Sequence, residues 1–379
     1  MNVFDRFVAL WNPQAALRRA NARAALRLID AHEKRRYEGA AKSRRTSGWR
    51  ATGADANAEA LPALDTLRNR SRDLVRNNPW AARAVQAIVS NTVGTGIMAK
   101  FADEKLQEAW KAWANSTDCD ADDTHDFSGL QALAMRTVAD SGEVLIRRRI
   151  RSSSDGLKVP LQIQVIEPDH LVTDRDSITK NGNRIVGGDE FDKIGRRVAY
   201  YLRRGHPGAV DSDSTVSRVP ADDVLHLYRC DRPGQVRGVP WGTSVMLRLR
   251  DLDDYEDAYL LRNKLANCMT AFVYQSDAVD AADSDDDPVL EALEPGAIEI
   301  LPNGKDIKFS TPPTVDGYGE YTRAVLKAIA AGYGITYEAL TGDLSQVNFS
   351  SGRMGWIEFG RNIAQWQWGM LVPGFCDPV

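Results

Sequence analysis

A long helical pattern over residues 243–269 places the strongest constraint on the fold of this 379-residue chain. Its apolar residues recur at spacings of three and four, which is typical of a helix that packs along one side, and Thr243 or Ser244 can cap its first turn. About 25 residues of helix extend for roughly 38 Å. The helix carries too many charges to cross a membrane, so we expect it to pack against neighbouring helices. The residues that represent its apolar stripe and its charged side are Arg248, Leu249, Leu252, Tyr255 and Tyr259.

Residues 140–230 show the alternation of apolar and polar side chains that indicates β-strands. Helical patterns flank this region. In residues 64–90, Asn78 and Pro79 predict a break between two helices, with Asn78 as the cap of the second. A β-rich body within a helical frame makes the expected fold class α+β. The strands expected in the body cover residues 143–149, 161–166, 184–186, 197–203 and 224–228.

A second β region is expected beyond the long helix. It begins with a short strand at residues 270–274, and an acidic run at 277–287 follows with little apolar content to order it. A pair of strands at 297–301 and 307–309 is expected to be joined by the turn-forming residues 302–304.

The charge of the chain is unevenly distributed. The net charge is −4, which argues against high-affinity, nonspecific DNA binding, because such binding needs a basic surface. Residues 1–50, however, contain twelve Arg or Lys and four Asp or Glu, about +8 in all. Within this arm a basic helix is expected at 15–37, followed by a linker at 41–62. The arm could be a nucleic-acid-binding module, or it could be a solvated surface helix.

No group of residues shows the spacing of a known catalytic, metal or cofactor site. The four cysteines are far apart, and an acidic run at 118–123 lacks the glycine and glutamate of a calcium loop. There is no phosphate-binding loop and no nucleophile elbow. His226 is expected to be a core histidine. We therefore expect no enzyme activity, no cofactor and no metal. Carboxylates that could act in acid–base chemistry, without an evident pair, are Glu143, Glu167, Asp169, Asp343 and Glu358.

The least ordinary stretch spans residues 333–361, where a polar loop at 341–351 lies between two helical patterns. Loops held by a rigid scaffold often carry function. Ser350 or Ser351 could be the nucleophile of a serine-type hydrolase, or either could cap the helix that follows.

Several motifs, in this order, resemble the portal protein family of lambda-type tailed bacteriophages. The resemblance covers nearly the whole chain, and the ordered set is more specific than any one motif. The segments that carry it are LRNRSRDLVRNNPWAARAVQAIVSNTVGTGI from Leu67, GEVLIRRR from Gly142, LQIQVIEPDHL from Leu161, GRRVAYYLRRGHPG from Gly195, VPADDVLHLYRCDRPGQVRGVPWG from Val219 and GITYEALTGDLSQVNFSSGRMG from Gly334.

The resemblance implies a ring, typically of twelve subunits, at one capsid vertex of the virion. Its channel would pass double-stranded DNA during packaging and ejection. The implied partners are terminase, head-completion (connector) proteins, scaffold and the major capsid protein, with assembly in the host cytoplasm and no membrane contact. The residues that would approach the channel and its DNA are Gln346, Asn348, Ser350, Ser351 and Arg353.

The resemblance also implies a division of the chain. Residues 1–62 would be the arm and linker, 63–242 a helical and β-rich wing, 243–295 the stem helix and clip, and 296–379 the returning wing strands, the tunnel loop and the helix after it. Family members usually continue beyond the position of Val379, so the C-terminal crown region is expected to be absent.

Overall fold

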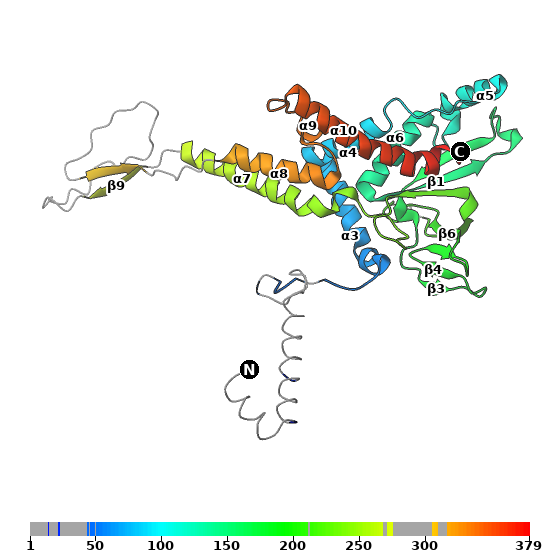
Figure 1. Ribbon diagram of the computed structural model, residues 1–379, viewed down its shortest axis with the longest axis horizontal. Helices are drawn as coiled ribbons and strands as arrows, with labels where there is room; N and C mark the ends of the chain where they lie inside the picture. Colours follow the sequence, from blue (N-terminus) through cyan, green and yellow to red (C-terminus); the bar gives the residue numbers. More distant parts are fainter. Residues whose placement is uncertain are drawn as a thin grey trace. The chain divides into compact units, whose positions relative to one another are not determined.

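The computed structural model describes residues 51–210, 213–267, 271–275, 305–309 and 317–379, together with a few positions between 14 and 49. The chain divides into two compact units, Met1–Ala54 and Asp55–Val379, and the second contains every element below. Most of the expected basic helix, the acidic run at 277–287 and the expected strand and turn at 297–304 lie outside the described residues. The second unit combines helices with antiparallel sheets, as Figure 1 shows, which confirms the α+β class.

Two consecutive helices, α3 (Ala56–Asn77) and α4 (Pro79–Thr92), form the expected helix pair. The Asn78 side chain accepts hydrogen bonds from the backbone N–H groups of Trp80 and Ala81, both at 3.0 Å, and this confirms the break and its cap. Helix α3 begins at Ala56, so residues 56–62 are helical and the expected linker is too long. The reason is local, because the Asp55 carboxylate caps the helix by accepting the N–H of Ala58.

Two further helices complete this part of the frame, α5 (Glu104–Ala114) and α6 (Phe127–Ser141). Trp110 and Trp113 of α5 face Phe127 at the start of α6, with ring centroids 5.3 and 5.7 Å away. The acidic run between these helices forms a turn: the buried Asp120 accepts hydrogen bonds from three backbone N–H groups. Short 3-10 helices cover Thr117–Cys119, Ser153–Asp155, Pro168–His170 and Ala221–Asp223.

The first sheet has three strands in the order β2-β1-β8: β1 (Glu143–Ile150), β2 (Leu161–Ile166) and β8 (Val224–Tyr228). Both pairings are antiparallel. The second sheet has five strands in sequence order, and all its pairings are antiparallel too. It consists of β3 (Ser177–Ile178), β4 (Arg184–Val186), β5 (Asp189–Phe191), β6 (Arg197–Arg203) and β7 (Val216–Pro220).

A small apolar cluster lies between strands of the two sheets, and a much larger core joins the helices to β1 and β8. The larger core contains buried residues of α4, α6, α8 (Tyr318–Tyr333) and α10 (Phe349–Trp366), together with the first turns of α7 (Met246–Asn267). The smaller cluster consists of Leu145, Leu171, Tyr200, Leu202, Val219 and Val224.

The long helix α7 covers Met246–Asn267 and therefore begins later than expected. A 3-10 helix at Trp241–Val245 precedes it, so neither Thr243 nor Ser244 is its cap; the Thr243 hydroxyl instead donates to the carbonyl of Pro240 at 2.6 Å. Close packing explains this start. A Cβ at Gly242 would lie 2.3 Å from the Tyr333 hydroxyl oxygen. The backbone at residue 242 therefore packs directly against Tyr333 just before α7 begins.

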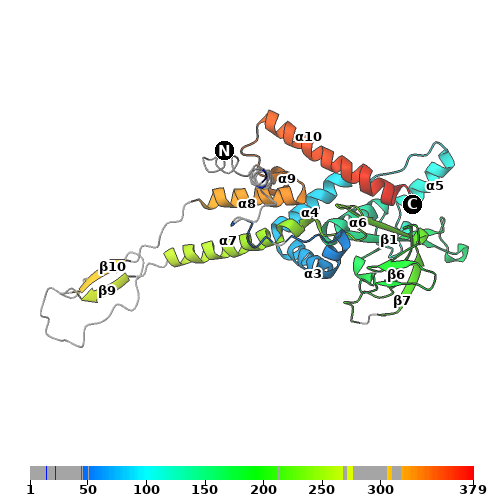
Figure 2. The same cartoon turned by 60° about the horizontal axis from the view of Figure 1, so that its bottom comes forward.

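Helix α8 (Tyr318–Tyr333) runs beside α7 in both views (Figures 1 and 2). The chain between them contains β9 (Ala271–Gln275) and β10 (Lys305–Phe309), which pair antiparallel. The strand expected at 270–274 is thus confirmed.

Two more helices follow α8: α9 (Tyr337–Thr341) and the longer α10 (Phe349–Trp366). Wider π-helical turns extend α10 through Gln367–Cys376. No helix in the described part of the chain has the length and apolar character needed to span a membrane.

Candidate functional site

Glycines set the ends of the helices on both sides of α9. Gly334 ends α8 with φ +74°, and Gly342 ends α9 with φ +71°. Both values lie in the left-handed region, which glycine enters without steric cost. The chain then crosses residues 343–347 and enters α10. The expected polar loop at 341–351 is therefore shorter in the structure, because α9 includes Thr341 and α10 begins at Phe349.

Asn348 is the cap of α10. Its side-chain oxygen accepts the backbone N–H of Ser351 at 2.8 Å, and its own N–H donates to the Ser351 hydroxyl oxygen at 3.1 Å. This reciprocal arrangement is a capping box. The expectation that Ser350 or Ser351 is the cap is therefore wrong, because Asn348 takes that position. Ser351 contributes to the capping box from the first turn of α10, and Ser350 is exposed beside it.

A cavity of about 610 Å³ lies among α4, α8, α9 and the start of α10. Gln346 and Ser351 line it, beside the basic side chains of Arg83, Arg323 and Lys327. None of the described residues around the cavity is a histidine, and the Ser351 hydroxyl also donates to the Asn348 carbonyl at 3.1 Å. A serine nucleophile needs a base within hydrogen-bond reach, so this arrangement does not favour the serine-type hydrolase.

The five residues expected near a channel lie together, in the loop before α10 and in its first two turns. Gln346, Asn348, Ser350, Ser351 and Arg353 are all exposed. Arg353 makes no ion pair with any residue that the structure describes, so its guanidinium group can meet an anion.

Helix α10 also exposes large apolar side chains that the sequence reasoning did not single out. The exposed fractions are 85% for Phe349, 73% for Met354, 61% for Trp356 and 47% for Ile357. Phe359, Ile363 and Trp366 of the same helix are buried. We call the four exposed residues the α10 apolar face; the exposed Arg353 lies among them, between Phe349 and Ile357. The available signal was the spacing in GRMGWIEFG, because Met354, Trp356, Ile357 and Phe359 do not all fall on one side of a helix.

The residues expected on the long helix divide between the core and a tyrosine contact. Leu249 and Leu252 are fully buried, whereas Arg248 is exposed. Tyr255 and Tyr259 stack on Tyr318 of α8, with ring centroids 6.0 and 4.6 Å apart. The aromatic stacking continues the α7–α8 contact beyond the core, since such ring pairs add to the energy of area burial.

A buried ion cluster connects α3, β1, β8 and the segment before α7. The Glu143 carboxylate accepts hydrogen bonds from Arg68 Nη2 at 2.8 Å, Arg237 Nη2 at 2.5 Å, the Gly238 N–H at 2.8 Å and His226 Nε2 at 3.0 Å. Burial alone would raise the pKa of Glu143, but the charge of Arg237 and the contact with His226 hold it well below its usual range.

His226 is a core histidine with a carboxylate partner, as expected, and burial lowers its pKa. Arg68 of α3 belongs to the same buried cluster, because its side chain is 1% exposed and pairs with Glu143.

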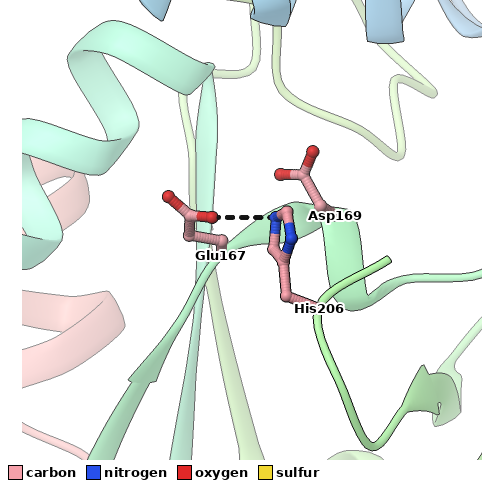
Figure 3. A group of neighbouring side chains, drawn as sticks. All are labelled: Glu167, Asp169 and His206. Carbon is pink, nitrogen blue, oxygen red and sulfur yellow. Dashed lines mark ion pairs between the residues drawn. The ribbon is translucent and has the colours of Figure 1, made fainter. Parts of the chain in front are cut away.

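Glu167, Asp169 and His206 lie close enough to suggest a metal site, and Figure 3 shows their side chains converging. Arg72 already binds Asp169 with two hydrogen bonds, at 3.1 and 2.6 Å. His206 Nε2 lies 3.1 Å from Glu167, while its Nδ1 accepts the Gly208 N–H. The charge of Arg72 and the engaged histidine do not suit a divalent cation, so we interpret the group as an ion-pair network.

Comparison with known proteins agrees with the ordered motifs. Residues 42–367 match the family described as phage portal protein, lambda family. The probable portal protein of Halomonas phage phiHAP-1 is 28% identical over 351 residues, covering 86% of this chain and 67% of that protein. Portal protein B of Escherichia phage lambda is 24% identical over 353 residues, covering 80% and 66%. The chain thus spans about two thirds of the length of these relatives.

Among solved structures, a chain from the neck of a native GTA particle, computed with C12 symmetry, aligns with a TM-score of 0.48 and 14% identity, covering 80% of this chain and 81% of that one. An HK97 family phage portal protein from Corynebacterium diphtheriae aligns with a TM-score of 0.33 and 13% identity, covering 82% and 86%. The sequence match, which extends over most of the chain, defines the class as phage portal protein. Within that class, this chain belongs to the lambda family.

Proposed function

We propose that copies of this chain close into a ring of twelve subunits at one vertex of a phage capsid. The ring surrounds a channel through which double-stranded DNA passes during packaging and ejection. The protein acts as a structural conduit in the virion after assembly in the host cytoplasm, and the chemical work of packaging belongs to terminase. Membership of the lambda portal family supports the proposal.

The observation that carries the proposal is the α10 apolar face. Soluble monomers rarely expose contiguous large apolar patches, and such patches usually mark a protein contact. A ring needs heterologous contacts, in which one surface of each subunit meets a different surface of the next. We propose that the α10 apolar face packs on the adjacent subunit.

The polar residues beside this face then approach the channel. Gln346, Asn348, Ser350 and Ser351 offer neutral groups that contact phosphates weakly, and Arg353 adds one cation. The net charge of −4 suits DNA that slides without strong retention.

The remaining parts follow the family arrangement. We propose that residues 63–242 form the wing, which meets scaffold and the major capsid protein. Residues 243–295 form the stem and clip, which contacts terminase first and the head-completion proteins later. Residues 296–379 bring the chain back to the wing and the channel, and residues 1–62 form the arm.

The assembly test replaces one apolar residue of α10 by a charge. Ile357→Glu should shift the 379-residue chain from a large oligomer to small species in sedimentation velocity. The matched control is Ile178→Glu, since Ile178 is 76% exposed on β3, away from α10. Circular dichroism should show that both variants fold. If Ile357→Glu assembles as the unaltered chain does, the α10 apolar face is not the ring contact.

A further inference from the structure

A second cavity, of about 680 Å³, opens between the two sheets, and four arginines are among the residues that line it. Its charged residues are four arginines and two carboxylates, namely Arg147, Arg149, Arg203, Arg204, Asp122 and Glu167. His170 and His206 also line it. One of the two carboxylates, Glu167, already faces His206 at 3.1 Å. We call this cavity the arginine cleft.

The cleft follows from the alternation of side chains along β1. Leu145 belongs to the apolar cluster between the sheets, and Arg147 and Arg149 are the next residues on the same face of the strand. The opposite wall contains Leu202 and Val219 from the second sheet. Apolar packing between the sheets therefore gives way to arginines where the space opens.

The arginines are incompletely paired within the described part of the chain. Arg147 Nε is buried and has no hydrogen-bond partner there. Arg149 binds only a neutral group, the Gln164 side-chain oxygen, at 3.0 and 2.6 Å. Arg203 lies 3.6 Å from Asp174, a carboxylate that is 79% exposed. Burial lowers the pKa of Arg149, and the charges of Arg147 and Arg151 lower it further. Like charges held together in this way are stabilised by an anionic ligand.

We propose that the arginine cleft binds an acidic peptide segment of a partner protein. A DNA duplex is too wide to enter a cavity of this volume, whereas an extended chain with carboxylate side chains can. The walls also contain Val165, Ile166, Leu202 and Val219, which suit the apolar side chains of a peptide and offer nothing to a phosphate backbone. The site is separate from the α10 apolar face, so it does not rest on ring formation.

The test measures the fluorescence anisotropy of a labelled peptide of alternating glutamate and leucine as the 379-residue chain is added. Arg147→Gln/Arg149→Gln should weaken binding at least tenfold. The matched control is Arg184→Gln/Arg196→Gln. It removes two exposed positive charges that lie outside the cleft, on β4 and in the turn before β6, and it should change affinity less than twofold. Arg203→Gln provides a second variant on the opposite wall, should the first pair not fold, and it should weaken binding too.

Three results would overturn the proposal. The first is equal binding of a peptide with glutamine in place of glutamate. The second is equal loss of affinity in the control variant. The third is tighter binding of a short DNA duplex that is also lost in Arg147→Gln/Arg149→Gln, since the cleft would then be a phosphate site.

Discussion

Replacement of Glu143 by glutamine removes a buried carboxylate that binds two buried guanidinium groups. Arg68 and Arg237 are each 1% exposed in their side chains, and Glu143 is fully buried. Glutamine keeps the shape and one acceptor oxygen, but it replaces an acceptor-only carboxylate with an amide that also carries N–H donors. In the unaltered protein Arg237, the Gly238 N–H and His226 Nε2 all donate to the Glu143 carboxylate. In the variant the amide N–H donors would face these same donor groups.

The expected cost is about 3–5 kcal/mol, the typical loss when one partner of a buried ion pair is removed and the other charge is left uncompensated. Since domains of ordinary stability unfold at roughly 5–15 kcal/mol, this is a large fraction of the total. Removing Arg68 as well should recover part of the loss. In Glu143→Gln/Arg68→Met one of the two uncompensated charges is gone. The double variant should therefore lose less unfolding free energy than the sum of the losses in Glu143→Gln and Arg68→Met.

Urea unfolding monitored by tryptophan fluorescence measures these differences. The control is Asp73→Asn, which removes the carboxylate of an exposed pair with Arg76 and should cost less than about 1 kcal/mol. A loss below about 1 kcal/mol for Glu143→Gln would refute the reasoning, and so would strict additivity of the Glu143 and Arg68 variants.

Two further predictions concern the cap of α10 and the response to acid. Asn348→Ala should cost about 1 kcal/mol and increase hydrogen exchange in the first turn of α10, whereas Ser350→Ala should leave both unchanged; equal effects would contradict the cap assignment. Stability should fall as the pH decreases from about 5 towards 2, because Arg218 lowers the pKa of Glu190 to about 2 and Glu143 is also held low. Groups with a lowered pKa in the folded state stabilise the protein above their unfolded pKa and lose that contribution in acid. Urea midpoints that do not change between pH 5 and pH 3 would contradict this account.

The elements that depend on local sequence were predictable. The Asn78–Pro79 break and the alternating pattern of β1 each reflect neighbouring residues, and the structure confirms them. Strands β3, β5 and β7 were missed. β3 and β5 have only two and three residues, and the missed β7 contains a proline, which weakens a strand pattern.

Features that depend on distant contacts were not predictable. Glu143 meets Arg68 across 75 residues and Arg237 across 94, so no local pattern marks the buried cluster. The late start of α7 depends on the approach of Gly242 to Tyr333. At α10, Asn348, Ser350 and Ser351 are all good capping residues, and their types alone do not show which one takes the position. The exposure of Phe349 and Trp356 likewise appears only when the packing of α10 is known.

The central claim is assembly into a ring, and native mass spectrometry of the 379-residue chain, with negative-stain images of the same sample, tests it most directly. The account predicts a single closed particle with a central channel and a mass near twelve times the 41.9 kDa of the chain. A protein that stays monomeric at every concentration, or forms open chains of variable length, would contradict it.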